Sequence, residues 1–145
     1  MIIYPNRGYY MPAGLLLWRG YKIYFYDKES NRDYVGDFMV ELAEQDWRTA
    51  QEILSGFFER IENGTGLPRE WISGRSPRLK KIQDDFWEYR HRSRKLGKII
   101  RIYFGVDEKT KSIIILNAHF KKGRKDQNRE MKTALKRFSR YKSRR

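Results

Sequence analysis

The chain of 145 residues contains no cysteine and no long hydrophobic run, and only two of its residues are histidines. Without cysteine, a disulfide framework, a thiolate zinc site and a cysteine nucleophile are excluded. The run from Ala13 to Trp18 is too short to cross a membrane or to form the hydrophobic core of a secretory signal. We therefore expect a cytoplasmic protein that makes no contact with membranes.

Signals for metals, cofactors and common nucleophiles are missing as well. No acidic cluster lies at ligand spacing beside His91 or His119, which argues against a transition-metal site. The sequence has no glycine-rich phosphate loop of either common type and no serine in a nucleophile-elbow pattern. We expect a protein that uses neither a metal nor a cofactor.

Acidic residues are scarce relative to basic ones. The chain has 32 Lys and Arg residues against 18 Asp and Glu residues, a formal net charge of +14. Because like charges repel each other in a compact state, such an excess usually indicates a polyanionic partner. The 39% of hydrophobic and 15% of aromatic residues suffice for a folded core, and the length suits one domain.

The charge is distributed unevenly along the chain. Residues 27–62 carry ten acids and four bases, residues 78–101 carry nine bases and three acids, and residues 121–145 carry twelve bases and two acids. Two basic blocks thus flank an apolar strand region, which favours contact with nucleic acid over a set of solvated faces. The acidic segment either faces a partner or keeps the protein soluble.

The first half of the chain predicts an arm, a strand and two helices. Residues 1–20 are aromatic, interrupted by Pro and Gly, and without a period, so we expect an irregular N-terminal arm. Residues 21–26 predict a strand and residues 34–42 a short helix. Asp46 predicts the cap of a second helix, which ends at Asn63-Gly64 because glycine adopts the left-handed conformation without steric cost. The apolar stripe of this helix comprises Trp47, Ala50, Leu54, Phe57, Phe58 and Ile61.

The second half is rich in strand signals. Residues 79–82 and 86–90 predict two short strands or one bent strand, and residues 91–97 predict a basic connector. The β-branched residues of 99–104 and 112–118 predict a hairpin.

A final helix is predicted near the C-terminus, with Asp126 or Asn128 as its N-cap. Its apolar stripe comprises Met131, Ala134, Leu135, Phe138 and Tyr141, and its other face is basic. The order of elements predicts an α+β fold: a mainly antiparallel sheet with N-terminal helices packed on one side and a basic C-terminal helix. We expect residues 21–145 to form a single domain.

Basic residues on the predicted strands are the candidates for chemistry. Because side chains alternate along a strand, Ile99, Arg101 and Tyr103 share one face. A hairpin that pairs residue 104 with residue 112 sets residue 101 opposite residue 115 and residue 99 opposite residue 117. The face of Arg101 and Tyr103 then also carries Asn117 and, just past the strand, His119 and Lys121. A shared concave surface suited to a phosphodiester is then lined by Arg90, Arg101, His119, Lys121 and Lys122.

The remaining polar residues of this region are interpreted more simply. Asp84, Asp85 and Glu88 form either an acid pair or a solvated strand edge, and we prefer the strand edge. His91 is interpreted as part of a basic loop.

Four segments of the second half occur in an order and spacing typical of one known superfamily. They are Lys80-Lys81-Ile82 with Phe86-Trp87-Glu88-Tyr89-Arg90, then Ile100-Arg101-Ile102-Tyr103-Phe104, then Ile115 to Lys122, and finally Glu130, Ala134 and Arg137. With the strand at 21–26 and the helix at 47–62, they resemble the RelE/HigB superfamily of toxins from bacterial type II toxin–antitoxin modules. The closest branch is the HigB-like, phage-derived one, and the resemblance covers about residues 21–141.

The resemblance implies a compact RelE-like fold with helices on one side of the sheet and RNA bound on the other. It implies an mRNA interferase that acts on mRNA at the ribosome and is neutralised by a cognate antitoxin. By motif position, Arg90, Arg101, Lys121 and Lys122 inherit the expectation of substrate binding or catalysis. Where the family often has histidine this chain has Asn117, so the histidine role has either moved to His119 or is absent.

The first functional hypothesis is a metal-free RNA endonuclease, in which the 2′-hydroxyl of the substrate attacks the adjacent phosphorus. Arg90 and Arg101 would stabilise the developing negative charge. His119, with an unperturbed pKa of about 6.5, would move the protons. Alternatively, a lysine whose pKa is lowered by neighbouring cations, Lys121 or Lys122, would act as the base. The residues expected to bind RNA are Lys122, Arg124, Lys125, Lys136, Arg137, Arg140, Arg92 and Arg94.

The second hypothesis keeps the fold but not the reaction. The protein would then be a non-catalytic nucleic-acid-binding protein, or would poison DNA gyrase as other members of the superfamily do, because a fold alone does not determine chemistry.

Overall fold

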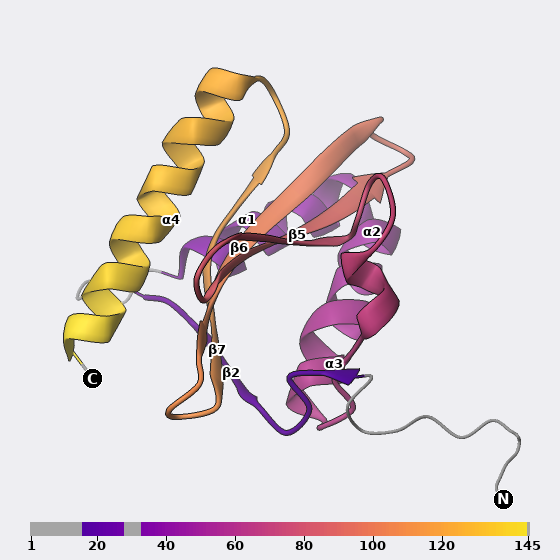
Figure 1. Ribbon diagram of the computed structural model, residues 1–145. Helices are drawn as coiled ribbons and strands as arrows, with labels where there is room; N and C mark the ends of the chain where they lie inside the picture. Colours follow the sequence, from indigo (N-terminus) through magenta and orange to yellow (C-terminus); the bar gives the residue numbers. More distant parts are fainter. Residues whose placement is uncertain (1–15, 28–32, 145) are drawn as a thin grey trace, which may run out of the picture.

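The computed structural model describes residues 16–27 and 33–144, and its centre is a five-stranded sheet (Figure 1). The strand order is β2-β7-β6-β5-β4. The strands are β2 (Lys22–Phe25), β4 (Leu79–Gln83), β5 (Phe86–Ser93), β6 (Lys98–Asp107) and β7 (Ser112–Phe120). All neighbouring strands are antiparallel except β2, which runs parallel to β7 at one edge. The predicted strand at 21–26 and the two separate strands around Asp84-Asp85 are confirmed.

The helices form where capping residues precede an apolar period. Asp33 accepts a hydrogen bond from the Gly36 N–H and begins α1 (Tyr34–Gln45). Asp46 accepts from the Thr49 N–H and begins α2 (Trp47–Ile53), which confirms the predicted cap. The helix continues through a π-helical turn, η2 (Leu54–Phe58), and α3 (Glu59–Glu62). It ends at Gly64, whose φ is +83°, as the sequence predicts.

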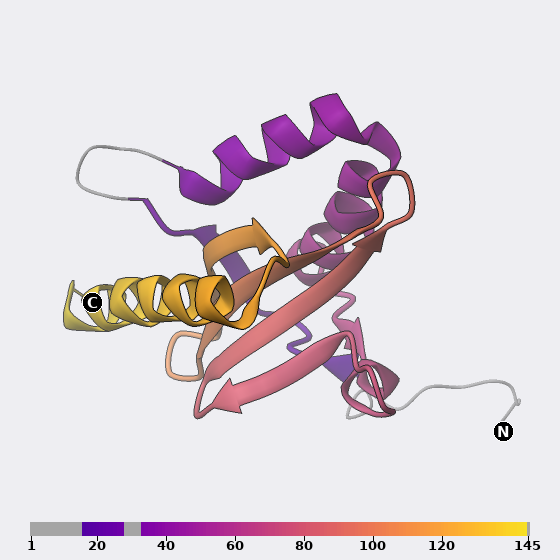
Figure 2. The same ribbon diagram turned by 90° about the horizontal axis from the view of Figure 1, so that it is seen from above.

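The two faces of the sheet have different cores. One core joins α1, α2, η2 and α3 to the sheet through residues such as Phe57, Ile102 and Ile115. The other core lies beneath α4 (Arg124–Arg144) and contains Tyr103, Leu116 and Phe138. Figure 1 shows α4 and the α2–α3 segment on opposite sides of the strands, and in Figure 2 α4 runs beside β7 toward the C-terminus. The α+β fold class is therefore confirmed.

One feature of the fold differs from what the resemblance implies. The sheet face opposite α1–α3 is not open, because α4 packs on it through its apolar stripe. Gly105 of β6 permits this close approach, since a Cβ built there would overlap the Phe138 ring. Only the part of this face beside α4, over β5 and β6, remains for a ligand.

The predicted hairpin register is wrong. Asp107, not residue 104, pairs with Ser112, and Arg101 pairs with His119. The strands are longer than predicted, and a bulge between Tyr103 and Phe104 places an extra residue on β7. The predicted common face of Arg101, Tyr103, Asn117 and His119 nevertheless holds, because both pairs lie before the bulge.

Three further local predictions need correction. The basic connector predicted at 91–97 is shorter, because β5 continues to Ser93 and only residues 94–97 form the turn before β6. Trp47 is 64% exposed, since it is the first residue of α2, and the fully buried Ile53 takes its place in the core. The last helix begins at Arg124, before either predicted cap, and the Gln127 N–H bonds the Gly123 carbonyl.

The N-terminal arm predicted over residues 1–20 lies mostly outside the described residues. Within it, Leu16–Leu17 forms a short strand, β1, that pairs with β3 (Leu67–Pro68), which a 3₁₀-turn, η3 (Arg69–Ile72), follows. Trp18 packs edge-on against Trp87 and Phe104. This end of the arm is therefore part of the folded domain. None of the helices in the described parts of the chain is long and apolar enough to cross a membrane.

Candidate nucleic-acid interface

Three of the predicted catalytic residues form a row across three adjacent strands. Arg90 of β5 is the cross-strand neighbour of Arg101 on β6, and Arg101 is the neighbour of His119 on β7. One step along the sheet, Glu88, Tyr103 and Asn117 form a second row in the same way. The face is the one on which α4 packs, since Asn117 donates to the Glu130 side chain and Tyr103 belongs to the core beneath the helix.

Glu88 joins the two arginines of the first row. Its Oε1 lies 3.5 Å from Nε of Arg90 and its Oε2 lies 3.7 Å from Nε of Arg101. Glu88 is 2% exposed and Arg101 is 5% exposed. The preferred interpretation of Glu88 as part of a solvated strand edge is therefore wrong, whereas Asp84 and Asp85 are exposed as expected. An isolated strand pattern does not reveal that this carboxylate is buried between two arginines.

The Glu88–Arg101 pair is close but incompletely bonded. Glu88 Oε2 and the Nε and Nη1 atoms of Arg101 are buried and have no hydrogen-bond partner. A buried arginine with unused donors costs free energy, so this pair is held together by charge rather than by ideal geometry. Only Arg90, whose side chain is 25% exposed, presents its guanidinium group toward solvent from this cluster.

His119 has both ring nitrogens engaged inside the protein. Its Nδ1 lies 2.9 Å from the Phe120 carbonyl oxygen, which can only accept, so Nδ1 carries the proton. Nε2, 3.1 Å from the Tyr103 hydroxyl oxygen, then accepts from that hydroxyl. Burial holds the pKa of His119 below its ordinary value, and burial raises the pKa of Tyr103 well above its own. His119 is thus a neutral imidazole at pH 7.

An exposed basic surface continues from this row onto α4. Lys121 and Lys122, directly after β7, are exposed, and so are Arg124 and Lys125 at the start of the helix. Along α4, one shallow hollow of about 670 Å³ is lined by basic residues at helical spacing, namely Lys125, Arg129, Lys132, Lys136, Arg137 and Arg140. Arg129 and Lys132 were missing from the predicted RNA-binding set, although their three- and four-residue spacing from Lys125 and Lys136 indicates the same helix face.

Arg137 differs from the other cations of α4. Its Nη1 donates to the Leu116 carbonyl oxygen at 2.8 Å and to Oδ1 of Asn117 at 3.1 Å. Its guanidinium group also lies 3.7 Å from the centroid of the Tyr34 ring. Arg137 therefore fixes α4 to β7 and to α1, and only part of its side chain faces the hollow.

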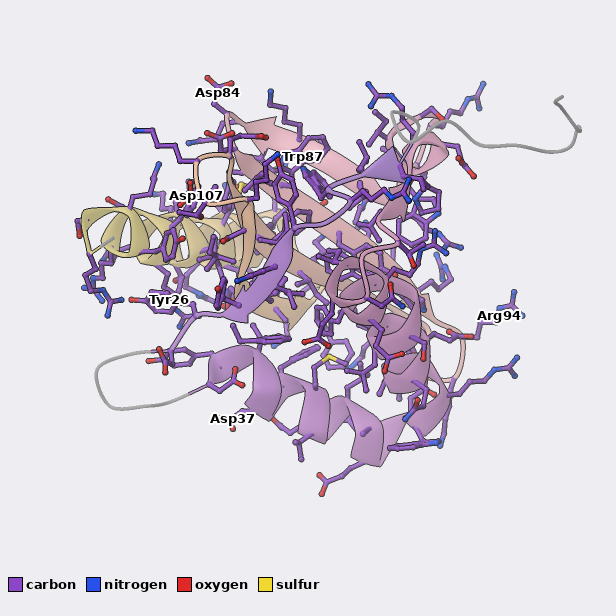
Figure 3. The ribbon with its side chains drawn as sticks, turned by 90° about the horizontal axis from the view of Figure 1, so that it is seen from below. Tyr26, Asp37, Asp84, Trp87, Arg94 and Asp107 are labelled. Atoms are coloured by element: carbon purple, nitrogen blue, oxygen red, sulfur yellow. The ribbon has the colours of Figure 1, made fainter. Side chains whose placement is uncertain are left out.

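The predicted RNA-binding residues Arg92 and Arg94 lie in another place. With Arg90 they line a groove between α2 and the edge of β5. Figure 3 shows Arg94 extending into solvent on the side of the molecule away from α4. His91, interpreted above as a loop residue, is a strand residue in this groove, 3.0 Å from Glu52 and 2.8 Å from the Tyr89 hydroxyl. The predicted site residues thus lie on two adjoining surfaces, which share Arg90.

The described residues contain no group of three or more His, Asp and Glu side chains placed to hold a metal ion. What they do contain is an α+β scaffold with a buried Arg–Glu–Arg cluster, a neutral histidine and a long exposed stripe of cations. The exposed cations give this surface a positive charge.

Residues 69–139, just under half of the chain, match the family model described as phage-derived protein Gp49-like (DUF891). That family is associated with toxin–antitoxin toxins of the RelE/HigB type. The matched segment runs from η3 through most of α4 and so includes both rows of the site. No curated protein and no solved structure matches the chain significantly.

Proposed function

We propose that this protein is the toxin of a toxin–antitoxin module and that it cleaves mRNA, at the ribosome, without a metal ion. The observation that carries the proposal is the row of Arg90, Arg101 and His119 on adjacent strands, which continues into the exposed Lys121 and the cations of α4. The match of residues 69–139 to the Gp49-like family supports the toxin class.

In the proposed reaction the 2′-oxygen of the RNA forms a bond to the adjacent phosphorus, and the bond from phosphorus to the 5′-oxygen of the next nucleotide breaks. The products are a 2′,3′-cyclic phosphate and a free 5′-hydroxyl. Arg90, the exposed arginine of the cluster, contacts the phosphoryl oxygens. Arg101 stabilises the developing charge from below and is held in place by Glu88.

Two protons have to move in this reaction. Nε2 of His119 takes the proton from the 2′-hydroxyl, which requires that the Tyr103 hydroxyl first releases this nitrogen. Lys121, an exposed ammonium group two residues beyond His119, delivers a proton to the leaving 5′-oxygen. The cations along α4 hold the flanking RNA by its phosphates.

The test is cleavage of a defined mRNA by the protein in the presence of translating ribosomes, with the ends mapped by primer extension and their chemistry determined. We expect discrete cuts with 5′-hydroxyl ends from the wild type and a loss on the order of 10²–10³ in rate for Arg90→Ala and Lys121→Ala. Lys109→Ala removes an exposed cation from the turn between β6 and β7 and is the matched control, with the wild-type rate expected. Cut ends that carry a 5′-phosphate, or cuts that survive in both site variants, contradict the proposal.

A second candidate function follows from the engaged state of the site. Because His119 has no free nitrogen and Arg101 is 5% exposed, the same surface also suits a toxin that grips nucleic acid without cleaving it. In either case, contact with about six phosphates of single-stranded RNA makes the logarithm of the binding constant fall with the logarithm of the salt concentration, with a slope of about −4. Product ends distinguish the two: tight, salt-sensitive binding without new ends, or inhibition of DNA supercoiling by gyrase, favours the non-catalytic toxin.

The proposed partners are mRNA, the ribosome and a cognate antitoxin. An antitoxin that neutralises this toxin has to bind a strongly basic molecule, so we expect acidic residues in its contact region. Co-expression with the antitoxin is expected to restore growth that the toxin alone arrests.

A further inference from the structure

The groove beside β5 adjoins the proposed RNA surface at Arg90, which lines it, and has a volume of about 1060 Å³. One wall is formed by α2 and the turns after it, with Arg48, Glu52 and Arg60. The other wall contains Trp71 and Arg78, whose guanidinium group lies 5.0 Å from the centroid of the Trp71 ring. Tyr89, His91 and Ile99 line it from the sheet.

In this groove, the edge of β5 that faces away from β6 has no neighbouring strand beyond Arg90 among the described residues. The pairing of β4 with β5 ends at Leu79 and Tyr89, and the Arg90 N–H makes one further bond, to the Arg78 carbonyl oxygen at 2.8 Å. Beyond it, β5 pairs only with β6 among the described residues. Since backbone groups alternate in direction along a strand, the N–H and C=O of Arg92 point the same way as those of Arg90, away from β6. Arg92 therefore offers an open donor and acceptor to an added strand.

The charge of the groove is positive and largely uncompensated. Of its two carboxylates, Asp46 accepts hydrogen bonds from Thr49 and Ser93, and Glu52 is bound by His91 and Arg48. In the described part of the chain, the lining cations that form no ion pair are Arg60, Arg78, Arg92, Arg94 and Lys95. The groove thus has a surplus of cations around an open strand edge and aromatic side chains.

We propose that this groove binds an extended acidic segment of a partner polypeptide, which adds to β5 as a strand and sets its carboxylates against the surrounding arginines. A polypeptide fits better than a nucleic acid, because only a peptide backbone alternates donors and acceptors at the spacing that Arg92 presents. The identification of the partner as the antitoxin rests on the proposed function; the binding of an acidic strand does not.

The position of Arg90 links this groove to the RNA surface. Its backbone N–H bonds Arg78 at the groove, and its side chain pairs with Glu88, which pairs with Arg101. A strand bound beside Arg92 is therefore two residues from the arginine that is proposed to contact the phosphate. Occupation of the groove provides a way to displace Arg90 and so to inhibit the toxin.

The probe is a fluorescein-labelled decapeptide of alternating glutamate and valine, added to the full-length protein. We expect saturable binding, with a dissociation constant about tenfold higher in the double variant R48E/R78E because two attractions become repulsions. K22E/K109E carries the same change of net charge outside the groove and is expected to bind within twofold of the wild type. A decapeptide of alternating lysine and valine is expected not to bind.

Amide hydrogen exchange followed by NMR tests the strand addition itself. At peptide saturation the Arg92 amide is expected to exchange at least tenfold more slowly, while the Arg90 amide, already bonded to Arg78, serves as the internal reference. The proposal is overturned if the peptide does not bind, if the two double variants lose it equally, or if the Arg92 amide is unaffected. A ten-nucleotide RNA that displaces the peptide and loses affinity in R48E/R78E assigns the groove to nucleic acid instead.

The cleavage assay with ribosomes reports independently on the proposed function. If the protein binds the peptide but does not cut mRNA, the groove remains assigned to an acidic strand, and only the identification of the partner as an antitoxin is withdrawn. If the protein cuts mRNA but does not bind the peptide, the proposed function stands and the groove assignment is withdrawn.

Discussion

The buried Glu88–Arg101 pair allows a sharp test of the site, because removal of the carboxylate leaves a positive charge in the protein interior. Glu88 is 2% exposed, Arg101 is 5% exposed, and the charged atoms lie 3.7 Å apart. At an effective dielectric constant of about 20, two charges at this distance attract by about 4 kcal/mol. Glu88→Ala is therefore expected to destabilise the protein by about 3–5 kcal/mol, the range typical of a buried pair that loses one partner.

The assay is urea unfolding followed by tryptophan fluorescence, together with the thermal midpoint. For a chain of this length, the expected loss corresponds to a fall of roughly 10 °C in Tm. Asp84→Ala is the matched control: its carboxylate lies 3.7 Å from Lys81 Nζ, the same separation, but its side chain is fully exposed. We expect that control to leave the urea and thermal midpoints at their wild-type values, because solvent screens an exposed ion pair.

A double variant separates the charge from the packing. Because Glu88 Oε2 and Arg101 Nε lack hydrogen-bond partners, the pair gains little beyond its charge attraction. E88L/R101M replaces it with apolar side chains of similar volume and is expected to lie within about 1–2 kcal/mol of the wild type or above it. If Glu88→Ala is as mild as Asp84→Ala, or if the double variant is the least stable, the assignment of Glu88 and Arg101 as a buried ion pair is refuted.

Three further predictions address packing and protonation. Gly105→Ala is expected to destabilise the protein by about 1–3 kcal/mol, because the added methyl group overlaps the Phe138 ring. The control Gly56→Ala, in a helix with open space around it, is expected to stabilise the protein by about 0.5–1 kcal/mol. Equal effects of the two substitutions in urea unfolding would contradict the contact between α4 and β6. Hydrogen bonds from Ser93 and Thr49 hold the pKa of Asp46 below its usual value, so the stability that this carboxylate contributes is present above about pH 4 and is lost as the pH falls through its folded pKa. Asp46→Asn is expected to be less stable at pH 7 and to show a flatter decline below pH 4; an unchanged decline argues against this carboxylate as its source. Burial lowers the pKa of His119, so its ring signals in an NMR titration are expected to shift with a midpoint below 6.5, and a midpoint above that value contradicts the neutral, buried imidazole.

Local sequence signals were sufficient for much of the secondary structure, because caps and apolar periods act over a few residues. Asp46, the glycine at position 64 and the stripe of Met131, Ala134, Leu135, Phe138 and Tyr141 each predicted an element that the structure contains. The alternation of side chains along β6 and β7 also placed Arg101 and His119 on one face. That prediction is correct although the predicted register is wrong, because the true partner of Arg101 is shifted along β7 by an even number of residues, which keeps each side chain on the same face.

The tertiary structure alone decided which of these residues are free to act. Glu88 is a buried partner of two arginines rather than a solvated carboxylate, and Arg137 holds α4 against β7 rather than standing free as an exposed cation. The pairing of β4 with β5 ends at Tyr89, so His91, Arg92 and Arg94, which the sequence placed in a connector, line a groove beside β5. Burial and the hydrogen-bond partners of a side chain come from segments distant in the chain, and no local pattern encodes them. Sequence thus determined the elements and the basic character of this protein, whereas packing determined where its charges are paired, buried or exposed.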